Sequence, residues 1–170
     1  MSRPPSPPRR PARRPAVAPR LVELAIESIG TGGDGVAQLD GHPVFVPFTV
    51  AGDRVLARVE ARRGEAAAAS LVELLSPGPG RVEPRCPHYG RCGGCSLQHL
   101  DDPRHDSWKM ATLVTQLARH RVAAEPVEPL VRGPAASRRR AVFAAMRQGR
   151  INRLGFNSRV LLVVGLVDSG

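Results

Sequence analysis

The chain has 170 residues, which is enough for one full domain or two small ones. Its formal net charge is +10 and is carried almost entirely by arginine, because Lys109 is the only lysine. Arginine binds phosphate bidentately, so this charge favours a polyanionic partner such as nucleic acid. The longest apolar run, residues 160–167, is far shorter than a membrane span. We expect a cytoplasmic, monomeric protein that has no membrane partner.

The first 19 residues are predicted to form a disordered basic tail. Residues 1–20 hold six arginines, seven prolines and no acidic residue. So many prolines exclude a helical presequence, and no apolar segment of a signal peptide follows them. The tail can contact phosphates non-specifically or can be a solvated extension, and the composition leaves both interpretations open.

Residues 20–78 show the pattern of short β-strands separated by turns. Apolar and polar residues alternate, and turn signals such as Asp40-Gly41 and Gly52-Asp53 separate the runs. Five strands are predicted, at residues 21–29, 36–39, 44–48, 54–60 and 67–75. Short strands with glycine-rich turns between them favour a small closed barrel of the OB type.

The segment from Gly30 to Gly35 matches the G-x-G-x-x-G pattern of dinucleotide-binding sites. Such a site needs a helix directly after the last glycine, so that the helix N-terminus faces the pyrophosphate. Here Gly41 and Pro43 follow within eight residues of Gly35, and a helix cannot run there. We therefore predict a glycine-rich turn of the barrel and no nucleotide site.

All three cysteines of the chain, Cys86, Cys92 and Cys95, lie within ten residues and form the pattern C-x5-C-x2-C. Gly93 and Gly94 allow the backbone between the last two to fold tightly. Soft sulfur ligands select zinc or iron–sulfur clusters over hard cations. We therefore predict that residues 79–100 form a metal-binding loop.

Other interpretations of the cysteines are weaker or leave the metal undecided. A disulfide framework requires an oxidising compartment and usually an even number of cysteines. A redox pair at Cys92 and Cys95 requires a βαβ context that this pattern lacks. A zinc site remains, with His88 or His99 as the fourth ligand of a Cys3His set. The spacing alone leaves zinc and iron–sulfur open.

Residues 101–170 are predicted to form one helix followed by antiparallel strands. Asp102 is a candidate N-cap with Pro103 as the first helical residue, and apolar residues recur at helical spacing as far as Leu117. Between Glu128 and Asp168 the chain has eight arginines and no acidic residue, which favours one basic face for a polyanion. The strands are predicted at residues 138–146, 150–156 and 160–167.

These pieces, in this order, resemble the N-terminal part of the bacterial RNA uracil-5-methyltransferases that carry a TRAM domain and a 4Fe–4S cluster. Residues 33–37 and 44–47 resemble the TRAM signature, and residues 86–99 resemble the cluster loop of that family. Residues 137–143 and 154–156 resemble the basic strands of its central domain. The cysteine loop is the strongest part of the resemblance.

The resemblance implies a mainly β protein: an OB-like, five-stranded TRAM barrel, a cysteine cluster loop, one helix and part of an antiparallel central domain. It implies that Cys86, Cys92 and Cys95 bind a 4Fe–4S cluster. The function implied is RNA binding, above all of ribosomal RNA, by the N-terminal portion of an S-adenosylmethionine-dependent rRNA uracil-5-methyltransferase. The candidate phosphate contacts are the arginines of the last segment, namely Arg138, Arg139, Arg140, Arg147, Arg150 and Arg153.

The sequence departs from this family near residue 170. The family has a fourth cysteine near the position of Asp168-Ser169-Gly170, where this sequence has none. The family's S-adenosylmethionine domain, its nucleophilic cysteine and its proton-abstracting base also have no counterpart. We therefore expect no catalytic residue in the sequence and no methyl transfer by the chain alone. The alternative is a free-standing, zinc-stabilised RNA-binding protein without enzymatic ancestry.

Overall fold

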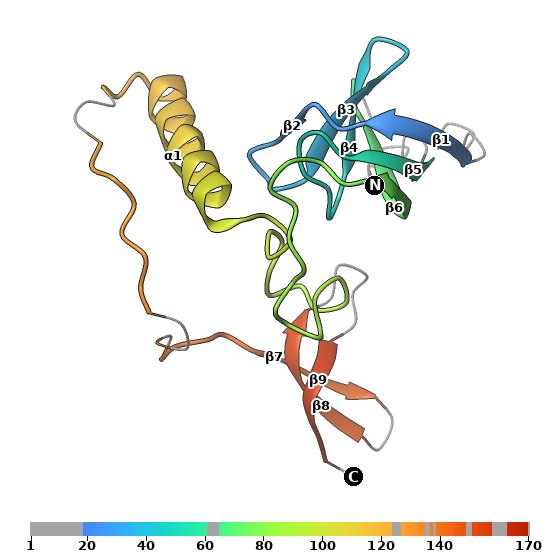
Figure 1. Cartoon of the computed structure of the whole chain (residues 1–170). Helices are drawn as coiled ribbons and strands as arrows, with labels where there is room; N and C mark the ends of the chain where they lie inside the picture. The colour runs from blue at the N-terminus through green and yellow to red at the C-terminus, as the bar shows by residue number, and fades with distance from the viewer. Residues whose placement is uncertain are drawn as a thin grey trace, which may run out of the picture.

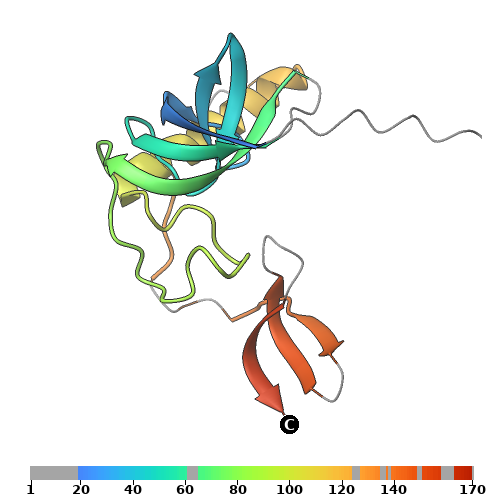
Figure 2. The same cartoon turned by 90° about the vertical axis from the view of Figure 1, so that its right-hand side faces the viewer.

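The computed structural model describes residues 19–60, 65–123, 127–134, 137, 139–148, 151–157 and 163–169. In chain order it contains a curled β-sheet, a long loop, a helix and a second, smaller sheet (Figures 1 and 2). In both views the loop lies between the two sheets. The predicted mainly β fold class is confirmed. The predicted tail lies, apart from its last residue, outside the described residues.

The first sheet is curled into a barrel-like shape. Its strand order is β1-β5-β6-β4-β3-β2, in which β4 and β6 are parallel and the other neighbours are antiparallel. Although only Ile26 and Glu27 separate β1 from β2, these strands lie at opposite ends of the order, so the sheet curls round on itself. The strands described are β1 Arg20–Ala25, β2 Ser28–Ile29, β3 Gly35–Leu39, β4 His42–Val46, β5 Arg54–Val59 and β6 Ala67–Ser76.

The first of the five predicted strands is divided because its middle residues bond to different neighbours. The Ile26 N–H donates to Asp53 O at 2.9 Å, next to the start of β5, and the Glu27 N–H donates to Val36 O of β3 at 2.8 Å. The run is therefore bent into two strands: β1 pairs with β5, and β2 pairs with β3. The barrel-like domain is as predicted, with this run counted as two strands.

Small aliphatic side chains fill the interior of the curled sheet. On β5, Val55, Ala57 and Val59 are buried, whereas the alternate positions Arg54 and Arg58 are exposed and Leu56 is half-buried. This period of two is the pattern of a strand with one face toward a core. The other buried members of the core are Leu24, Ile26, Ala37, Val44, Val46, Ala67 and Ala69.

Glycine is required at two positions of the glycine-rich segment between β2 and β3. Gly33 has a φ of +87°, which glycine adopts without a steric penalty. A Cβ at Gly35 would lie 2.0 Å from Thr49 Oγ1, and the Thr49 side chain is itself fully buried. Strand β3 begins at Gly35, so no helix follows the glycines. The segment is a turn of the barrel, as predicted.

Asp53 is a buried carboxylate in the connection between β4 and β5. It accepts hydrogen bonds from the backbone N–H groups of Val50, at 2.7 Å, and Gly78, at 2.8 Å. Arg81 Nη2 lies 2.7 Å from Asp53 Oδ2 and also donates to Phe48 O at 2.8 Å. These contacts fix the end of β6 and the start of the long loop to the β4–β5 connection.

The hydrogen bonds of Asp53 also determine its ionisation. Burial raises the pKa of Asp53, but hydrogen bonds from Arg81, Val50 and Gly78 and the positive charge of Arg81 together lower it below its ordinary value of 3.8. Because the folded-state pKa is the lower one, the ionised carboxylate stabilises the fold above pH 3.8. This stabilisation is lost as the pH falls through the folded-state pKa.

Helix α1, Asp102–Arg119, lies beside the curled sheet (Figure 1). Its N-cap is Asp101, whose carboxylate accepts a hydrogen bond from the Arg104 N–H at 3.0 Å. The predicted N-cap, Asp102, is wrong by one residue because both aspartates can cap a helix and only Asp101 reaches the orphan donor. The Trp108 Nε1–H donates to Gly30 O at 3.1 Å and joins the helix to the barrel turn. Among the described residues, no helix is both long and apolar enough to cross a membrane.

The second sheet is antiparallel, with the order β7-β8-β9. Three strands were expected in this segment from the alternation of the sequence. The first was expected from residue 138, but residues 139–143 are extended without a strand assignment. The strands described are β7 Ala144–Gln148, β8 Ile151–Asn157 and β9 Val163–Ser169.

Replacing Asp53 by alanine is expected to destabilise the curled sheet strongly. The change removes the buried counter-ion of Arg81, whose side chain is only 17% exposed. It also leaves the N–H groups of Val50 and Gly78 without their acceptor. Removing one partner of a buried ion pair costs about 3–5 kcal/mol. Urea unfolding followed by circular dichroism measures this loss as a lower transition midpoint.

The matched control is Glu23→Ala, which also removes a carboxylate that faces an arginine. Glu23 and Arg54 are 3.5 Å apart, and both side chains are exposed. Exposed pairs contribute at most about 1 kcal/mol, so this variant should unfold near the midpoint of the original protein. Equal losses in the two variants would mean that the buried pair does not hold the β4–β5 connection.

Candidate functional site

The cysteines lie on a long loop whose two ends are held together. The Val82 N–H donates to His99 O at 2.9 Å, and the Asp101 N–H donates to Gly80 O at 2.8 Å. An isolated antiparallel β-bridge forms between the same two ends. The loop therefore leaves the barrel and returns to it at one place, with the three cysteines in between.

Tyr89 and His99 attach the inside of this loop to the barrel. The Tyr89 hydroxyl donates to Ser96 O at 2.7 Å and contacts His99 Nδ1. Because the hydroxyl has a single hydrogen, His99 Nδ1 supplies the hydrogen of the second bond. The Tyr89 ring packs edge-on against Phe48, with ring centroids 5.3 Å apart. His99 is almost fully buried, so this pair anchors the loop from within.

The loop packs against both sheets at two glycines. A Cβ at Gly33 of the barrel turn would lie 3.4 Å from Ser96 Oγ and 3.6 Å from Leu97 Cδ1. A Cβ at Gly94 would lie 3.2 Å from the ring of Phe156 on β8. The loop is therefore the contact between the barrel and the second sheet.

The structure places the three predicted metal ligands on the outer part of the loop. Cys86 and Cys92 are half-buried and Cys95 is exposed, and all three are free thiols. The Gly94 N–H lies 3.4 Å from Cys92 Sγ, and the Cys86 N–H donates to Gln98 Oε1 at 3.1 Å. Three soft donors on one loop fit a thiophilic metal chemically.

The structure does not bring these donors into one ligand set. Within the described ranges, no group of three His, Cys, Asp or Glu side chains could hold a metal ion. The candidate fourth ligand His99 has its Nδ1 bonded to Tyr89, and the other candidate, His88, is exposed. The metal site and its ligands remain a prediction of the sequence.

The six predicted phosphate contacts are spread over the segment before β7 and the second sheet. Arg139 and Arg140 are exposed in the extended segment, and Arg147 is exposed on β7. Arg138 and Arg150 lie outside the described residues. The backbone of Arg153 is paired with Met146 in the β7–β8 ladder.

The register of β7 and β8 separates two of these arginines. Arg147 is opposite Asn152, and the next pair of the ladder sets Arg153 opposite Met146. Successive positions of a strand alternate between the two faces of a sheet. Positions 147 and 153 of the ladder therefore belong to opposite faces of the second sheet.

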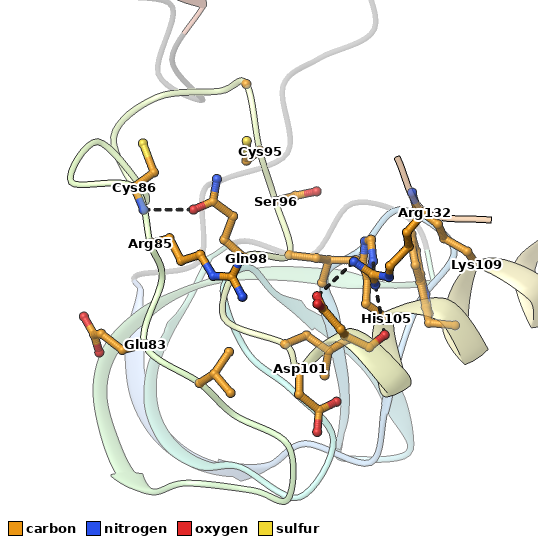
Figure 3. Close-up of a pocket in the computed structure, with 16 residues that line it drawn as sticks. Glu83, Arg85, Cys86, Cys95, Ser96, Gln98, Asp101, His105, Lys109 and Arg132 are labelled. Atoms are coloured by element: carbon orange, nitrogen blue, oxygen red, sulfur yellow. Dashed lines mark hydrogen bonds and ion pairs between the residues drawn. The ribbon is translucent and has the colours of Figure 1, made fainter. Parts of the chain in front are cut away.

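A cleft of about 860 Å³ lies between the cysteine loop and the first half of α1. Figure 3 shows Arg85, Cys86 and Gln98 on the loop side and His105, Lys109 and Arg132 on the helix side. Ser96 and Trp108 also line the cleft. Cys95 and the carboxylates of Glu83, Asp101 and Asp102 line it as well. The cleft thus combines cationic and anionic groups with an aromatic ring, thiols, and amide and hydroxyl groups.

Arg132 attaches the extended segment after α1 to the helix. Its Nε donates to Asp106 Oδ2 at 2.8 Å, and its Nη1 donates to Asp102 Oδ1 at 2.9 Å. Its Nη2 lies 3.0 Å from His105 Nδ1. Because a guanidinium is only a donor, His105 must accept this bond at an unprotonated Nδ1.

The charges around Arg132 shift three pKa values. The hydrogen bond to Asp106 raises the pKa of Arg132, and the same bond lowers the pKa of Asp106. Burial lowers the pKa of His105, and the positive charges of Lys109 and Arg132 lower it further. The carboxylates of Asp106 and Asp102 raise this pKa, but by less, so the pKa stays below its ordinary value. At neutral pH the His105 ring is therefore uncharged, as its bond from Arg132 requires.

The residues of this cleft could not be found from local sequence patterns. Arg132 is separated by 26 residues from Asp106, so no local pattern connects them. Arg85 and Lys109 are single cations without a motif. The clustering of His105, Trp108 and Lys109 on successive turns of the predicted helix is the one signal that could have suggested a surface here.

Comparison with known proteins identifies relatives among RNA-modifying enzymes. An uncharacterized RNA methyltransferase of Caulobacter vibrioides is 42% identical over 142 residues, which are 82% of this chain and 33% of that protein. The 23S rRNA (uracil(1939)-C(5))-methyltransferase RlmD of Alkalilimnicola ehrlichii is 40% identical over 125 residues, 72% of this chain and 28% of that protein. RlmD of Pectobacterium carotovorum is 37% identical over 164 residues, 96% of this chain and 36% of that protein. No protein-family model matches the chain.

The chain belongs to the RNA methyltransferase family that includes these 23S rRNA (uracil(1939)-C(5))-methyltransferases. This confirms the resemblance drawn from the sequence motifs. The chain spans about a third of the length of the curated relatives that it matches.

The His105 imidazole is expected to titrate below its ordinary pKa of 6.5, because burial, Lys109 and Arg132 all disfavour its protonation. As the pH falls, His105 is protonated in the unfolded chain before it is protonated in the folded protein. Above pH 6.5 the ring is neutral in both states, and the bond from Arg132 contributes its full stability to the fold. That contribution falls as the pH drops below 6.5 toward the folded-state pKa. An NMR titration of the His105 ring protons measures the midpoint.

Lys109→Ala should raise this midpoint, because it removes a positive charge one turn from the ring. Arg119→Ala is the control, since it removes a positive charge from the other end of the same helix and should leave the midpoint unchanged. A midpoint at or above 6.5 in the original protein would contradict the environment described for His105.

Proposed function

We propose that this chain is the RNA-binding and iron–sulfur-binding N-terminal portion of an S-adenosylmethionine-dependent rRNA uracil-5-methyltransferase, which forms 5-methyluridine. The observation that carries the proposal is the identity to RlmD of Pectobacterium carotovorum over 96% of this chain. The aligned residues are 36% of that protein, so the proposal concerns one portion of the enzyme. Its substrate would be RNA, and in particular ribosomal RNA.

Charge supports RNA as the partner. The net charge is +10, and the segment from residue 129 to residue 167 has arginines but no acidic residue. Arg139, Arg140 and Arg147 are exposed there and can reach a phosphate backbone. Contacts of this kind hold nucleic acid without reading its sequence, so specificity would come from elsewhere in the site.

The cysteine loop would hold the two sheets in position for that RNA. Ser96 and Leu97 contact the barrel turn at Gly33, and Gly94 contacts Phe156 of the second sheet. Cys86, Cys92 and Cys95 would be the protein ligands of the cluster. The bound cluster would supply metal–sulfur bonds that cross-link the loop, while Tyr89 and His99 fix the loop to the barrel.

The RNA contacts can be tested by the salt dependence of binding. The double variant Arg139→Ala and Arg140→Ala should bind single-stranded ribosomal RNA fragments more weakly. The slope of log affinity against log salt should fall by about one unit for each phosphate that the protein no longer neutralises. Fluorescence anisotropy of a labelled RNA at several salt concentrations measures this slope.

The double variant Arg20→Ala and Arg54→Ala is a control with the same loss of charge. Both of these arginines form exposed ion pairs on the barrel, with Asp40 and Glu23. Their removal should change the slope less, because both arginines lie on the barrel and not in the acid-free segment from residue 129 to residue 167. Equal changes in the two double variants would attribute the effect to net charge and not to phosphate binding by Arg139 and Arg140.

The metal can be tested by anaerobic reconstitution with iron and sulfide. We expect the protein to bind iron and acid-labile sulfide, and the cluster to be labile because the chain supplies only three cysteines. Cys95→Ser should reduce the bound iron further. Stoichiometric zinc without sulfide, even after reconstitution, would favour the zinc-stabilised alternative and sink the iron–sulfur proposal.

A further inference from the structure

We propose that the cleft between the cysteine loop and α1 binds one unstacked nucleotide of a single-stranded RNA. This inference rests on the proposed RNA-binding function and adds a second contact point for the RNA, apart from the arginines of residues 138–153. The cleft has a volume of about 860 Å³, within the range of pockets that hold small ligands. It is lined by two parts of the loop, by the first half of α1 and by Arg132.

The helix side of the cleft provides a surface on which a base can stack. His105 and Trp108 are stacked on each other, with ring centroids 6.1 Å apart and an interplanar angle of 24°. The bond from Trp108 Nε1 to Gly30 O fixes one ring, and the bond from Arg132 to His105 fixes the other. Unstacked RNA bases bind such aromatic surfaces regardless of their sequence.

The cations of the cleft are placed for the phosphates on either side of that base. Arg85 is exposed on the loop side and Lys109 is exposed on the helix side (Figure 3). Arg132 is already bonded to Asp102 and Asp106, so it positions His105 and does not serve as a phosphate ligand. A chain passing through the cleft would meet one cation on each side.

The loop side provides hydrogen-bonding groups for the edge of the base. Gln98 Oε1 accepts the Cys86 N–H, which holds the side chain in place and leaves its amide NH2 as a donor for a ligand. The Ser96 hydroxyl lines the same wall. These groups can bond the Watson–Crick edge of a base only where that edge is not already engaged in a base pair. The arrangement thus favours single-stranded RNA.

Trp108 makes a direct test possible, because it is the only tryptophan of the chain. Its fluorescence is measured while a short single-stranded oligouridylate is added, and the anisotropy of the same RNA, carrying a label, is measured in parallel. The expected result is quenching of Trp108 that saturates together with the anisotropy. Arg85→Ala and Lys109→Ala should each weaken binding by about tenfold at constant salt, as expected when a charge-assisted hydrogen bond is removed.

Arg119→Ala is the matched control, because Arg119 is exposed at the far end of the same helix and does not line the cleft. It should change the affinity less than about twofold, the effect of one distant, screened charge. A rise in anisotropy without quenching would overturn the cleft as the site and leave the proposed RNA binding intact. So would equal effects of Lys109→Ala and Arg119→Ala, or equal quenching by duplex RNA. No binding by either measurement would overturn the proposed function, and this inference with it.

Discussion

The buried carboxylate of Asp53 and the guanidinium of Arg81 join two parts of the chain that are distant in sequence. Asp53 belongs to the connection between β4 and β5, Gly78 follows β6, and Arg81 begins the cysteine loop. A buried charge is tolerated only when its partners satisfy it, and here the contacts from Gly78 and Arg81 also link the β4–β5 connection to the end of β6 and the start of the loop. The direction in which the loop leaves the barrel therefore depends on this one pair.

The glycine-rich turn between β2 and β3 is the second point on which the later segments depend. It receives Ser96 and Leu97 of the loop at Gly33, and it accepts the Trp108 N–H of α1 at Gly30 O. The G-x-G-x-x-G pattern marks a nucleotide site in other proteins, but in this chain the turn contacts the cysteine loop and α1. The glycines thus matter for assembly as much as for the turn itself.

The barrel could be predicted from the sequence because each strand carries its own alternation of apolar and polar residues. The division of the first strand at Ile26 and Glu27 could not, because no breaker residue marks it and the cause is the pairing with two different neighbours. The start of α1 was missed by one residue because Asp101 and Asp102 are both competent caps. The cleft depends on Arg132, whose partners lie 26 to 30 residues away, and such contacts leave no local signal.

The closure of the cysteine loop at its base has a consequence for how this part of the molecule can vary. The chain departs at Gly80 and Val82 and returns at His99 and Asp101, and hydrogen bonds of 2.8 and 2.9 Å join the two points. The excursion between them begins and ends at one place, so residues added to or removed from its tip leave the paths of β6 and α1 unchanged. The outer loop is accordingly a module: its length and its cysteines can be exchanged without rebuilding the barrel beneath it.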